Sequence, residues 1–339
     1  MGKQKDQLRR LSQEMDRQKI NDKERDEINK FISHMRENPI SYNDINPSNT
    51  DIKLNRLCSI EDWQNNQISK AILELQQVVA HDYIHKINWE TSENIVNCRK
   101  PGLIHRKDWE WAMGLIAMDR MGKLNKQNVA IGIGAGREEI LFYLANKLSH
   151  VHATDLYDGK NWKNFAPPDF VTNPKKYSPF PYMEDKLTVS RMDATKLEFA
   201  DESFDIAFSF SSIEHFSGDN HTGALKSMKE IGRVLKSKGI AVISTEYILN
   251  NKEHSEFFNR RTIYSDLIYK LKNLELIEPL DLRITTNTLD NIIHYDTAVF
   301  WDRSENNYEF KKNHPLILLR VDDMIVTSVM LVFQKRSNH

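Results

Sequence analysis

Residues 128–157, NVAIGIGAGREEILFYLANKLSHVHATDLY, decide the fold of this chain of 339 residues. Asn128–Ile133 is short, apolar and rich in β-branched residues, which predicts a buried strand. Gly134-Ala135-Gly136 then predicts a tight turn that a ligand can approach closely. Apolar residues at helical spacing follow, and Val151–Thr154 returns to strand character. The stretch therefore predicts a strand, a glycine turn, a helix and a second parallel strand.

An acidic residue, Asp155, ends the second of these strands, about twenty residues beyond the glycines. A carboxylate at this edge of a sheet can accept hydrogen bonds from both hydroxyls of a ribose. The dinucleotide pattern G-x-G-x-x-G fails, because its third glycine would be Arg137 or Glu139 in the two registers. A nucleoside cofactor without a pyrophosphate is therefore indicated, and S-adenosylmethionine is the obvious candidate. A glycine turn in an unrelated α/β protein is the alternative.

Three more strands are expected downstream, at Leu187–Arg191, Phe204–Ser209 and Ile240–Thr245. A helix from about Thr222 to Lys236 precedes the last of them, with Gly239 as its stop. With the segments MDATKLEFADESFDIAFSFSSIEHF (192–216) and EIGRVLKSKGIAVIS (230–244), this order resembles the class I S-adenosylmethionine-dependent methyltransferases, with methyltransferase-11-like motifs. The resemblance covers roughly residues 105–250 and is specific as a set.

The resemblance implies an α/β fold, a Rossmann-like seven-stranded methyltransferase sheet with helices on both faces. Residues 1–100 are expected to form a helical N-terminal extension and residues 101–339 the methyltransferase domain. That domain would carry an insertion at 156–186 and an acceptor-side cap at about 250–314. Leu316–Val321 and Ile325–Phe333 predict an antiparallel hairpin at the sheet edge, whereas Leu276–Ile284 competes for strand six.

The family's cofactor roles carry over to residues at the carboxyl ends of strands. The glycine turn would line the methionine portion, Asp155 would hold the ribose, and Asp193 would accept from the adenine amine. The full set so assigned is Gly132, Gly134, Ala135, Gly136, Asp155, Leu156, Asp193, Ala194, Phe210 and Ser211. Two alternatives stay open: Asp155 as a loop cap and Asp193 as a turn or helix-cap aspartate.

One position departs from the family pattern. The family usually has an acidic residue two positions before the first loop glycine, and Gly132 stands there. Glu138 or Glu139 is the candidate substitute. The departure keeps open a non-catalytic scaffold with a degenerate cofactor pocket, while the failed dinucleotide pattern disfavours a nicotinamide oxidoreductase.

Catalytic candidates follow strands four and five. Methyl transfer needs two aligned reactants, and a hydroxyl acceptor also needs a general base. His215 is the preferred base, and the alternative is that it is a structural histidine that caps the following helix. His221 is a weaker candidate for the base. Glu246 and Tyr247 end strand five and are expected to face the same edge, where either could orient the acceptor. The resemblance implies that the expected helix Trp109–Met121 lies beside the methionine end of the cofactor, so Arg106 and Glu110 are candidates for that end.

The insertion after Asp155 is rich in aromatic residues and proline, so it is expected to fold over the acceptor or to cover core. Asp158 and Trp162 are its preferred substrate residues, together with His215. The base-methylating motif N/D-P-P-Y/F is absent after strand four. A small-molecule or sugar-containing acceptor, methylated on oxygen or nitrogen, is therefore expected.

Composition bounds the remaining possibilities. The net charge of −1 shows no basic excess, so no nucleic-acid partner is expected. Cys58 and Cys98 lack metal-ligand spacing, so they are expected to be ordinary reduced thiols. No signal segment or apolar membrane span is apparent in the sequence, which favours a cytoplasmic protein. Residues 1–38 are densely charged with two apolar stripes, which predicts amphipathic helices. These helices would pack on the core, or bind a partner or a second copy.

Overall fold

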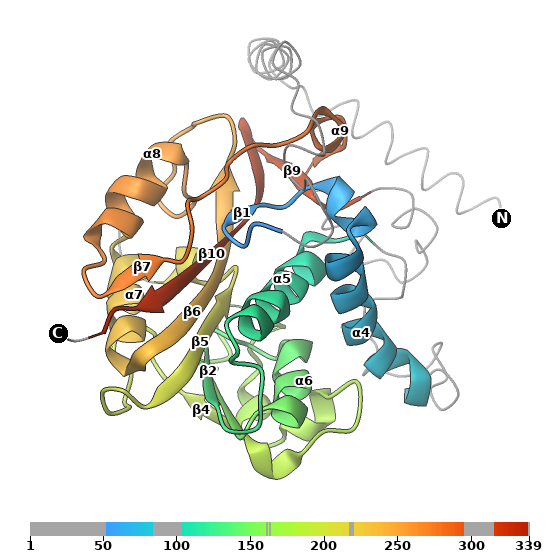
Figure 1. Ribbon diagram of the computed structural model, residues 1–339, viewed down its shortest axis with the longest axis vertical. Coiled ribbons are helices and arrows are strands. Elements are labelled where there is room, and N and C mark those ends of the chain that lie inside the picture. Colours follow the sequence, from blue (N-terminus) through green and yellow to red (C-terminus); the bar gives the residue numbers. More distant parts are fainter. Residues whose placement is uncertain are drawn as a thin grey trace.

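The computed structural model describes residues 52–83, 104–160, 162, 164–216, 220–294 and 315–337. A single ten-stranded sheet of order β4-β3-β2-β5-β6-β10-β9-β8, with β1 and β7 also paired to β10, runs through these residues (Figure 1). Its strands are β1 (Arg56–Leu57), β2 (Val129–Ile133), β3 (His150–Asp155), β4 (Leu187–Arg191), β5 (Phe204–Phe210), β6 (Leu235–Ile248), β7 (Leu274–Leu276), β8 (Ile292–His294), β9 (Leu318–Val321) and β10 (Met324–Lys335).

The parallel half of the sheet matches the expected α/β fold. Strand β2 lies between β3 and β5, with Ile131 opposite His152 on one side and Ala207 on the other. Strands β4 and β6 extend this half outward, also in parallel. The carboxyl ends of β2 to β6 therefore meet at one edge, where open α/β sheets bind ligands.

The antiparallel half corrects the expected strand count from seven to ten. Strand β10 pairs with β6 along one side, from Val326 opposite Ile248 to Gln334 opposite Ile240. Along its other side lie β9, β1 and β7 in succession. The expected β9–β10 hairpin is confirmed, but the place of strand six is shared by three short segments distant in sequence.

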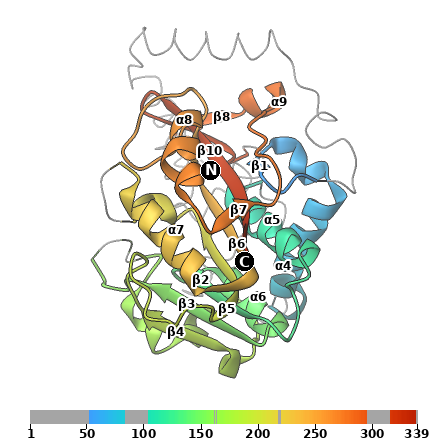
Figure 2. The same cartoon turned by 60° about the vertical axis from the view of Figure 1, so that its left-hand side comes forward.

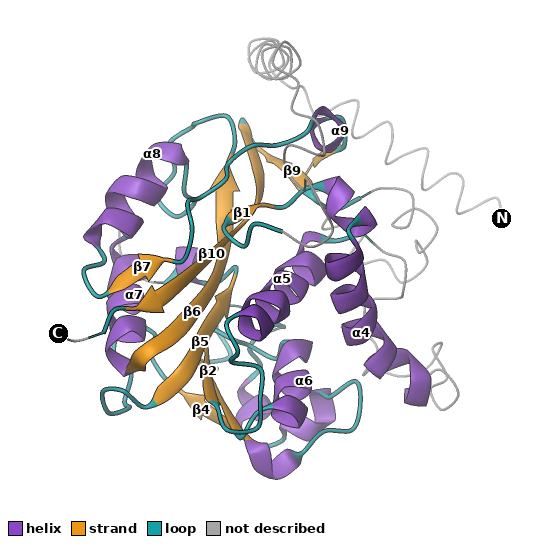
Figure 3. Ribbon diagram, in the orientation of Figure 1, coloured by secondary structure: helices purple, strands orange, loops and turns teal. Residues whose placement is uncertain are grey.

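Helices cover both faces of the sheet (Figures 2 and 3). The helical elements are η1 (Ile60–Gln64), α4 (Asn66–Tyr83), α5 (Arg106–Arg120), α6 (Glu139–Lys147), η3 (Pro168–Val171), η4 (Pro174–Tyr177), η5 (Glu184–Lys186), η6 (Ile213–His215), α7 (Thr222–Val234), α8 (Arg260–Thr262), η7 (Ile263–Leu267), η8 (Ile268–Lys270) and α9 (Thr286–Leu289). Helices α5 and α6 pack on one face and α7 on the other, and α4 packs against α5. Helix α5 approaches β5 closely because Gly114 leaves room for the Phe210 ring.

Several element boundaries differ from expectation. Helix α7 ends at Val234, and β6 begins at Leu235, so Gly239 lies within the strand instead of stopping the helix. Within the expected cap, residues 260–270 form a short α-turn, a π-turn and a 3₁₀-turn in succession.

The expected helices of residues 1–38 lie outside the described residues, as do residues 295–314 of the expected cap. The boundary between an extension of residues 1–100 and a domain of residues 101–339 stays a prediction, although β1 adds Arg56 and Leu57 to the main sheet. No helix within the described ranges is long and apolar enough to cross a membrane.

Candidate active site

The glycine turn after β2 is tied to the end of β3 by Asp155. Both Gly134 (φ +61°) and Gly136 (φ +46°) occupy the left-handed region, which favours glycine. The Asp155 carboxylate accepts from the backbone N–H of Gly136 at 2.9 Å and from that of Leu156 at 2.7 Å. Burial raises the pKa of Asp155, and these two hydrogen bonds oppose the rise. Asp155 therefore caps the loop, which was one of the two alternatives. It also lies at the carboxyl edge of the sheet, where a residue that binds the ribose hydroxyls is expected.

Gly132 has no room for a side chain. A Cβ atom there would lie 2.7 Å from the Phe208 ring and 2.9 Å from the Ala135 Cβ. The family's usual acid is thus excluded by packing at this position.

A buried charge cluster lies beside the glycine turn instead. The Lys107 ammonium donates to the Phe210 carbonyl at 2.6 Å and lies 2.5 Å from Glu138 Oε1 and 3.2 Å from Glu110 Oε2. Ser211 Oγ also donates to Glu110, at 2.8 Å. Burial alone would raise the pKa of Glu110, but Lys107 and Arg106 outweigh it and lower the pKa to about 2. Glu138, one of the two substitutes considered for the missing acid, therefore belongs to a cluster that also contains Glu110.

A second part of this cluster reaches β6. Arg106 lies 2.5 Å from Glu246 Oε1 and donates to Ser328 Oγ at 3.0 Å. Behind it, buried Glu214 accepts from Thr245 Oγ1 at 2.9 Å. Sequence reasoning missed Lys107 and Glu214. Lys107 lies three residues before Glu110 and Arg106 four residues before it, and this helical spacing of opposite charges is the signal that would have indicated Lys107.

The expected adenine side is formed by the turn after β4. The Met192 N–H donates to the Asp155 carbonyl at 2.9 Å, so the turn adjoins the end of β3. Asp193 Oδ1 accepts from the N–H and the hydroxyl of Thr195, both at 2.8 Å. Asp193 is thus a turn aspartate by its bonds, and its exposed carboxylate, beside buried Ala194, still faces solvent at the carboxyl edge. The Phe210 ring is buried against α5, so only its backbone reaches the site.

The insertion lies over the glycine turn. The Phe165 carbonyl accepts from the Arg137 N–H at 2.9 Å and would lie 2.5 Å from a Cβ on Gly136. The Tyr157 hydroxyl donates to the Gly136 carbonyl at 2.6 Å. Asp158 accepts from the Lys160 N–H at 2.8 Å and forms part of the same connection.

His215 and Trp162, two of the three residues expected at the substrate, lie side by side. Their ring centroids are 4.7 Å apart, and His215 Nδ1 lies 3.0 Å from Glu256 Oε2. His221 is instead buried, bonded to Asp266 at 3.2 Å and to the Phe257 carbonyl at 3.1 Å. These bonds give His221 a structural role.

Glu246 and Tyr247 do not face the same space. Successive strand residues point to opposite faces. Glu246 accordingly contacts Arg106 of α5, whereas Tyr247 packs in the core cluster that contains α7. Only Glu246 therefore lies on the face of the sheet that carries α5, and a role for either residue in orienting an acceptor stays a prediction.

Residues 131–243 match the sequence profile of a family described as "Methyltransferase domain". The solved structures similar to the chain include the YcgJ protein of Bacillus subtilis (16% identity, 66% of this chain and 98% of that chain, TM-score 0.42). The [4+2]-cyclase SpnF is another, with 16% identity over 83% of this chain and 99% of that chain and a TM-score of 0.42. A putative sarcosine dimethylglycine methyltransferase from Galdieria sulphuraria is a third, with 15% identity over 79% of this chain and 98% of that chain and a TM-score of 0.42. No curated protein matches the chain.

The profile match begins in β2 and ends in β6, so it spans the glycine turn, Asp155 and Asp193. The strand order over these residues is the open parallel arrangement expected from the sequence. The match therefore supports, over residues 131–243, the resemblance to the class I S-adenosylmethionine-dependent methyltransferases.

Proposed function

We propose that this chain is an S-adenosylmethionine-dependent methyltransferase that methylates an oxygen or nitrogen atom of a small-molecule or sugar-containing acceptor. The observation that carries the proposal is the pair Asp155 and Asp193. They follow adjacent strands, next to the glycine turn, and are connected by the bond between Met192 and Asp155. This pair would hold the ribose hydroxyls and the adenine amine.

The charge cluster fits the methionine end of the cofactor. That end carries an ammonium and a carboxylate, and the cluster offers both complementary signs. Glu110 and Glu138 would face the ammonium, and Arg106 and Lys107 the carboxylate. S-adenosylmethionine, when bound, supplies an electrophilic methyl group.

The chain's own residues would align the acceptor and accept its proton. His215 is the base in this proposal, because its ring lies at the mouth of the site beside Trp162. Glu256 contacts Nδ1 of the ring and would orient it towards an acceptor. The Trp162 ring, 57% exposed, offers an apolar surface on which an acceptor ring can stack.

Calorimetric titration with S-adenosylmethionine, S-adenosylhomocysteine and NADH tests the cofactor. We expect the two adenosyl ligands to bind and NADH not to bind. Asp155→Ala should lose adenosyl binding, whereas Asp185→Ala, an exposed aspartate of η5, should retain it. Binding of neither adenosyl ligand, or equal binding by both variants, would contradict the proposal.

A non-catalytic scaffold is the second candidate, favoured by the packing around the glycine turn. The Phe165 carbonyl lies against Gly136, and the Phe216 ring lies against Gly134. Release of S-adenosylhomocysteine during incubation with a panel of sugars and small hydroxylated or amino compounds separates the candidates. Turnover that falls at least tenfold in His215→Gln supports the enzyme, whereas cofactor binding without turnover of any panel member supports the scaffold.

A further inference from the structure

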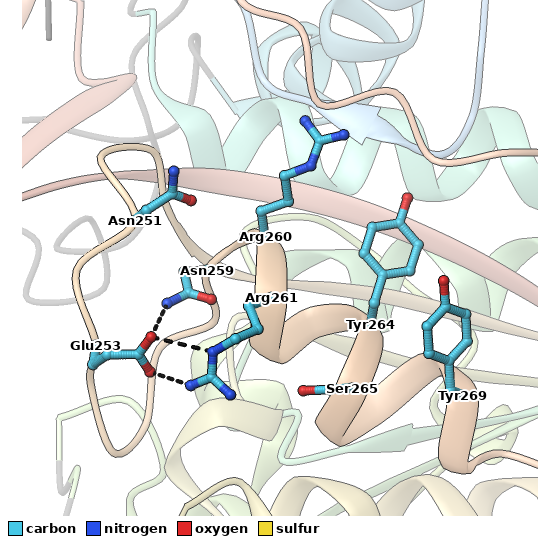
Figure 4. Close-up of a pocket in the computed structure, with 8 residues that line it drawn as sticks. All are labelled: Asn251, Glu253, Asn259, Arg260, Arg261, Tyr264, Ser265 and Tyr269. Carbon is cyan, nitrogen blue, oxygen red and sulfur yellow. Dashed lines mark hydrogen bonds and ion pairs between the residues drawn. The ribbon is translucent and has the colours of Figure 1, made fainter.

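A surface cavity lies beyond the end of β6. Its volume is about 640 Å³, and it is lined by Asn251, Glu253, Asn259, Arg260, Arg261, Tyr264, Ser265 and Tyr269 (Figure 4). None of these residues was selected from the sequence or used in the proposed chemistry above. The cavity therefore needs an account of its own.

The helical geometry of residues 260–270 places one cation and two phenols on the same side. Arg260 and Tyr264 are four residues apart, the spacing of neighbours on a helix face. Tyr269 is five residues beyond Tyr264, and an α-helix would turn it away. The π-turn Ile263–Leu267, in which the Ile268 N–H reaches the Ile263 carbonyl, widens the helix so that Tyr269 returns to that side.

The two tyrosines are close neighbours in space. Their ring centroids are 5.5 Å apart at an interplanar angle of 36°. In Figure 4 the Arg260 guanidinium and both phenol hydroxyls point the same way, whereas Arg261 turns towards Glu253. π-turns of this kind occur frequently at functional sites.

The donors on this side are available to a ligand. Arg261 is neutralised by Glu253 at 2.6 Å. Arg260 is exposed and, among the contacts within the described ranges, makes no hydrogen bond or ion pair. Tyr269 is 76% exposed, so its ring and hydroxyl are open to solvent beside Tyr264. The cavity thus presents one uncompensated guanidinium and two phenols to solvent.

Hydrogen bonds of Asn259 hold the start of this helical segment against the facing loop. Asn259 is 2% exposed and caps the helical segment, because its side chain accepts from the Thr262 N–H at 2.9 Å. The same side chain donates to the Lys252 carbonyl at 3.0 Å and to Glu253 Oε1 at 3.1 Å. The cap therefore fixes the opposite wall of the cavity together with the start of the helix.

We propose that Arg260, Tyr264 and Tyr269 bind the phosphate or carboxylate group of a ring-containing small molecule, such as a sugar phosphate or a sugar acid. A guanidinium binds such oxyanions through charge-assisted hydrogen bonds, and the phenols donate further hydrogen bonds. The tyrosine faces supply stacking surface for the attached ring.

The cavity is connected to the methyl-transfer site through one loop. Glu253 lines the cavity, and Glu256, on the same connection between β6 and α8, contacts His215. A ligand held by its anionic group here would share a wall with the proposed base. That this ligand is the methyl acceptor rests on the proposed function, whereas its binding at Arg260 does not.

Direct titration of the full chain, without cofactor, tests the site. The probes are glucose 6-phosphate, glucuronate, inorganic phosphate, uncharged glucose, and phosphatidylcholine vesicles with and without phosphatidic acid. We expect glucose 6-phosphate or glucuronate to bind more tightly than glucose. Arg260→Gln should weaken that binding at least tenfold, and Tyr269→Ala should weaken it by a smaller factor. Arg336→Gln, an exposed arginine elsewhere that is paired with Glu275, is the matched control and should bind normally.

Each outcome decides the question. Equal affinity of the Arg260→Gln variant, binding of inorganic phosphate alone, or binding of acidic vesicles alone would overturn the proposal. Absence of binding to every soluble probe would overturn it as well. Asp155→Ala should leave anion binding unchanged, so loss of cofactor binding and loss of this site are told apart in the same set of titrations.

Discussion

At the scale of single residues, Gly132 explains the departure from the family pattern. The sequence shows that the usual acid is absent, but only the packing shows why, since the Phe208 ring fills the space beside the strand. The carboxylates that flank the turn come from Glu110 and Glu138 instead, held by Lys107. The local electrostatics are thereby carried by a helix and a loop and not by the strand itself.

Restoring the family residue should therefore harm the protein. Gly132→Asp is expected to cost at least about 1–3 kcal/mol of unfolding free energy from overpacking against Phe208. Urea unfolding measures this loss. Gly132→Ala isolates the steric part, and the double variant Gly132→Ala/Phe208→Leu should recover some of it. A Gly132→Asp variant that is fully stable and binds cofactor more tightly would show that the space is not closed.

Glu214 predicts an unusual pH dependence. Burial raises its pKa to about 7, an effect that His215 opposes and Glu246 reinforces. Because the folded-state pKa lies above the unfolded value, the stabilising contribution is present below about pH 4.5 and is lost as pH rises through about 7. The difference corresponds to a loss on the order of 3 kcal/mol across that window.

Glu214→Gln should remove this dependence. Unfolding free energies of parent and variant, followed from about pH 5 to about pH 8, should diverge as the pH rises, with the variant the more stable at the upper end. Glu198→Gln, an exposed glutamate, serves as the control and should keep the parent profile. Parallel profiles for Glu214→Gln and the parent would be evidence against a raised pKa.

Residue placement was predictable where strand ends alone decide it. The rings of His215 and Trp162, which the sequence assigned to the substrate site together, have centroids 4.7 Å apart because both residues follow the carboxyl edge. Glu246 and Tyr247 were grouped by the same rule, yet the two-residue period of β6 sends them to opposite faces. The position along a strand predicts at which edge of the sheet a residue lies, but the face of the sheet to which its side chain points must be assigned as well.

At the scale of elements, β1 and η1 fasten the first described segment to the core. Arg56 and Asp62 form an ion pair at 2.9 Å with both side chains essentially inaccessible to solvent. Asp62 also accepts from the Trp109 indole at 2.7 Å and from the Ser59 N–H at 3.1 Å. One carboxylate thus joins β1, η1 and α5.

Asp62→Ala should be among the most destabilising substitutions in this region. It leaves the Arg56 charge buried without this partner, which typically costs about 3–5 kcal/mol. Thermal and urea unfolding measure the effect, with Asp119→Ala on the exposed end of α5 expected to stay within about 0.5 kcal/mol of the parent. A small effect at Asp62 would mean that the segment contributes little to folding.

Element types were predictable from periodicity, whereas irregular elements were not. The strands of the parallel half and the β9–β10 hairpin carry clear apolar runs. β1 contains two residues, too few to show alternation, and its pairing depends on β10 far along the chain. The π-turn Ile263–Leu267 could not be predicted either, because its apolar residues also fit an ordinary helix.

At the scale of the whole molecule, cofactor binding should stabilise the fold. A ligand that binds only the folded state at about a hundred times its Kd adds about 2.7 kcal/mol. S-adenosylhomocysteine should therefore raise the melting temperature of the parent, while Asp155→Ala melts at the same temperature with and without ligand. A ligand-dependent rise of equal size in the variant would show that Asp155 does not hold the ribose.

The overall topology was predictable from the alternation of strands and helices between 128 and 248, which fixes a parallel sheet. The outer edge was not. There β9, β1 and β7 complete one side of β10, and no local pattern links residues 56–57, 274–276 and 318–321. Such an edge is determined by long-range pairing alone.

This composite edge has a consequence for the order in which the chain is made. β10 lies inside the sheet, between β6 and the three short strands, yet it is synthesised after all of them. While the ribosome is still translating β7 and β9, β1 and the outer edge of β6 cannot yet form their backbone hydrogen bonds to β10. Nascent chains at this stage expose unpaired strand edges, the feature that favours chaperone capture and aggregation. We therefore expect β10 to insert between β6 and the three short strands only after these have been synthesised.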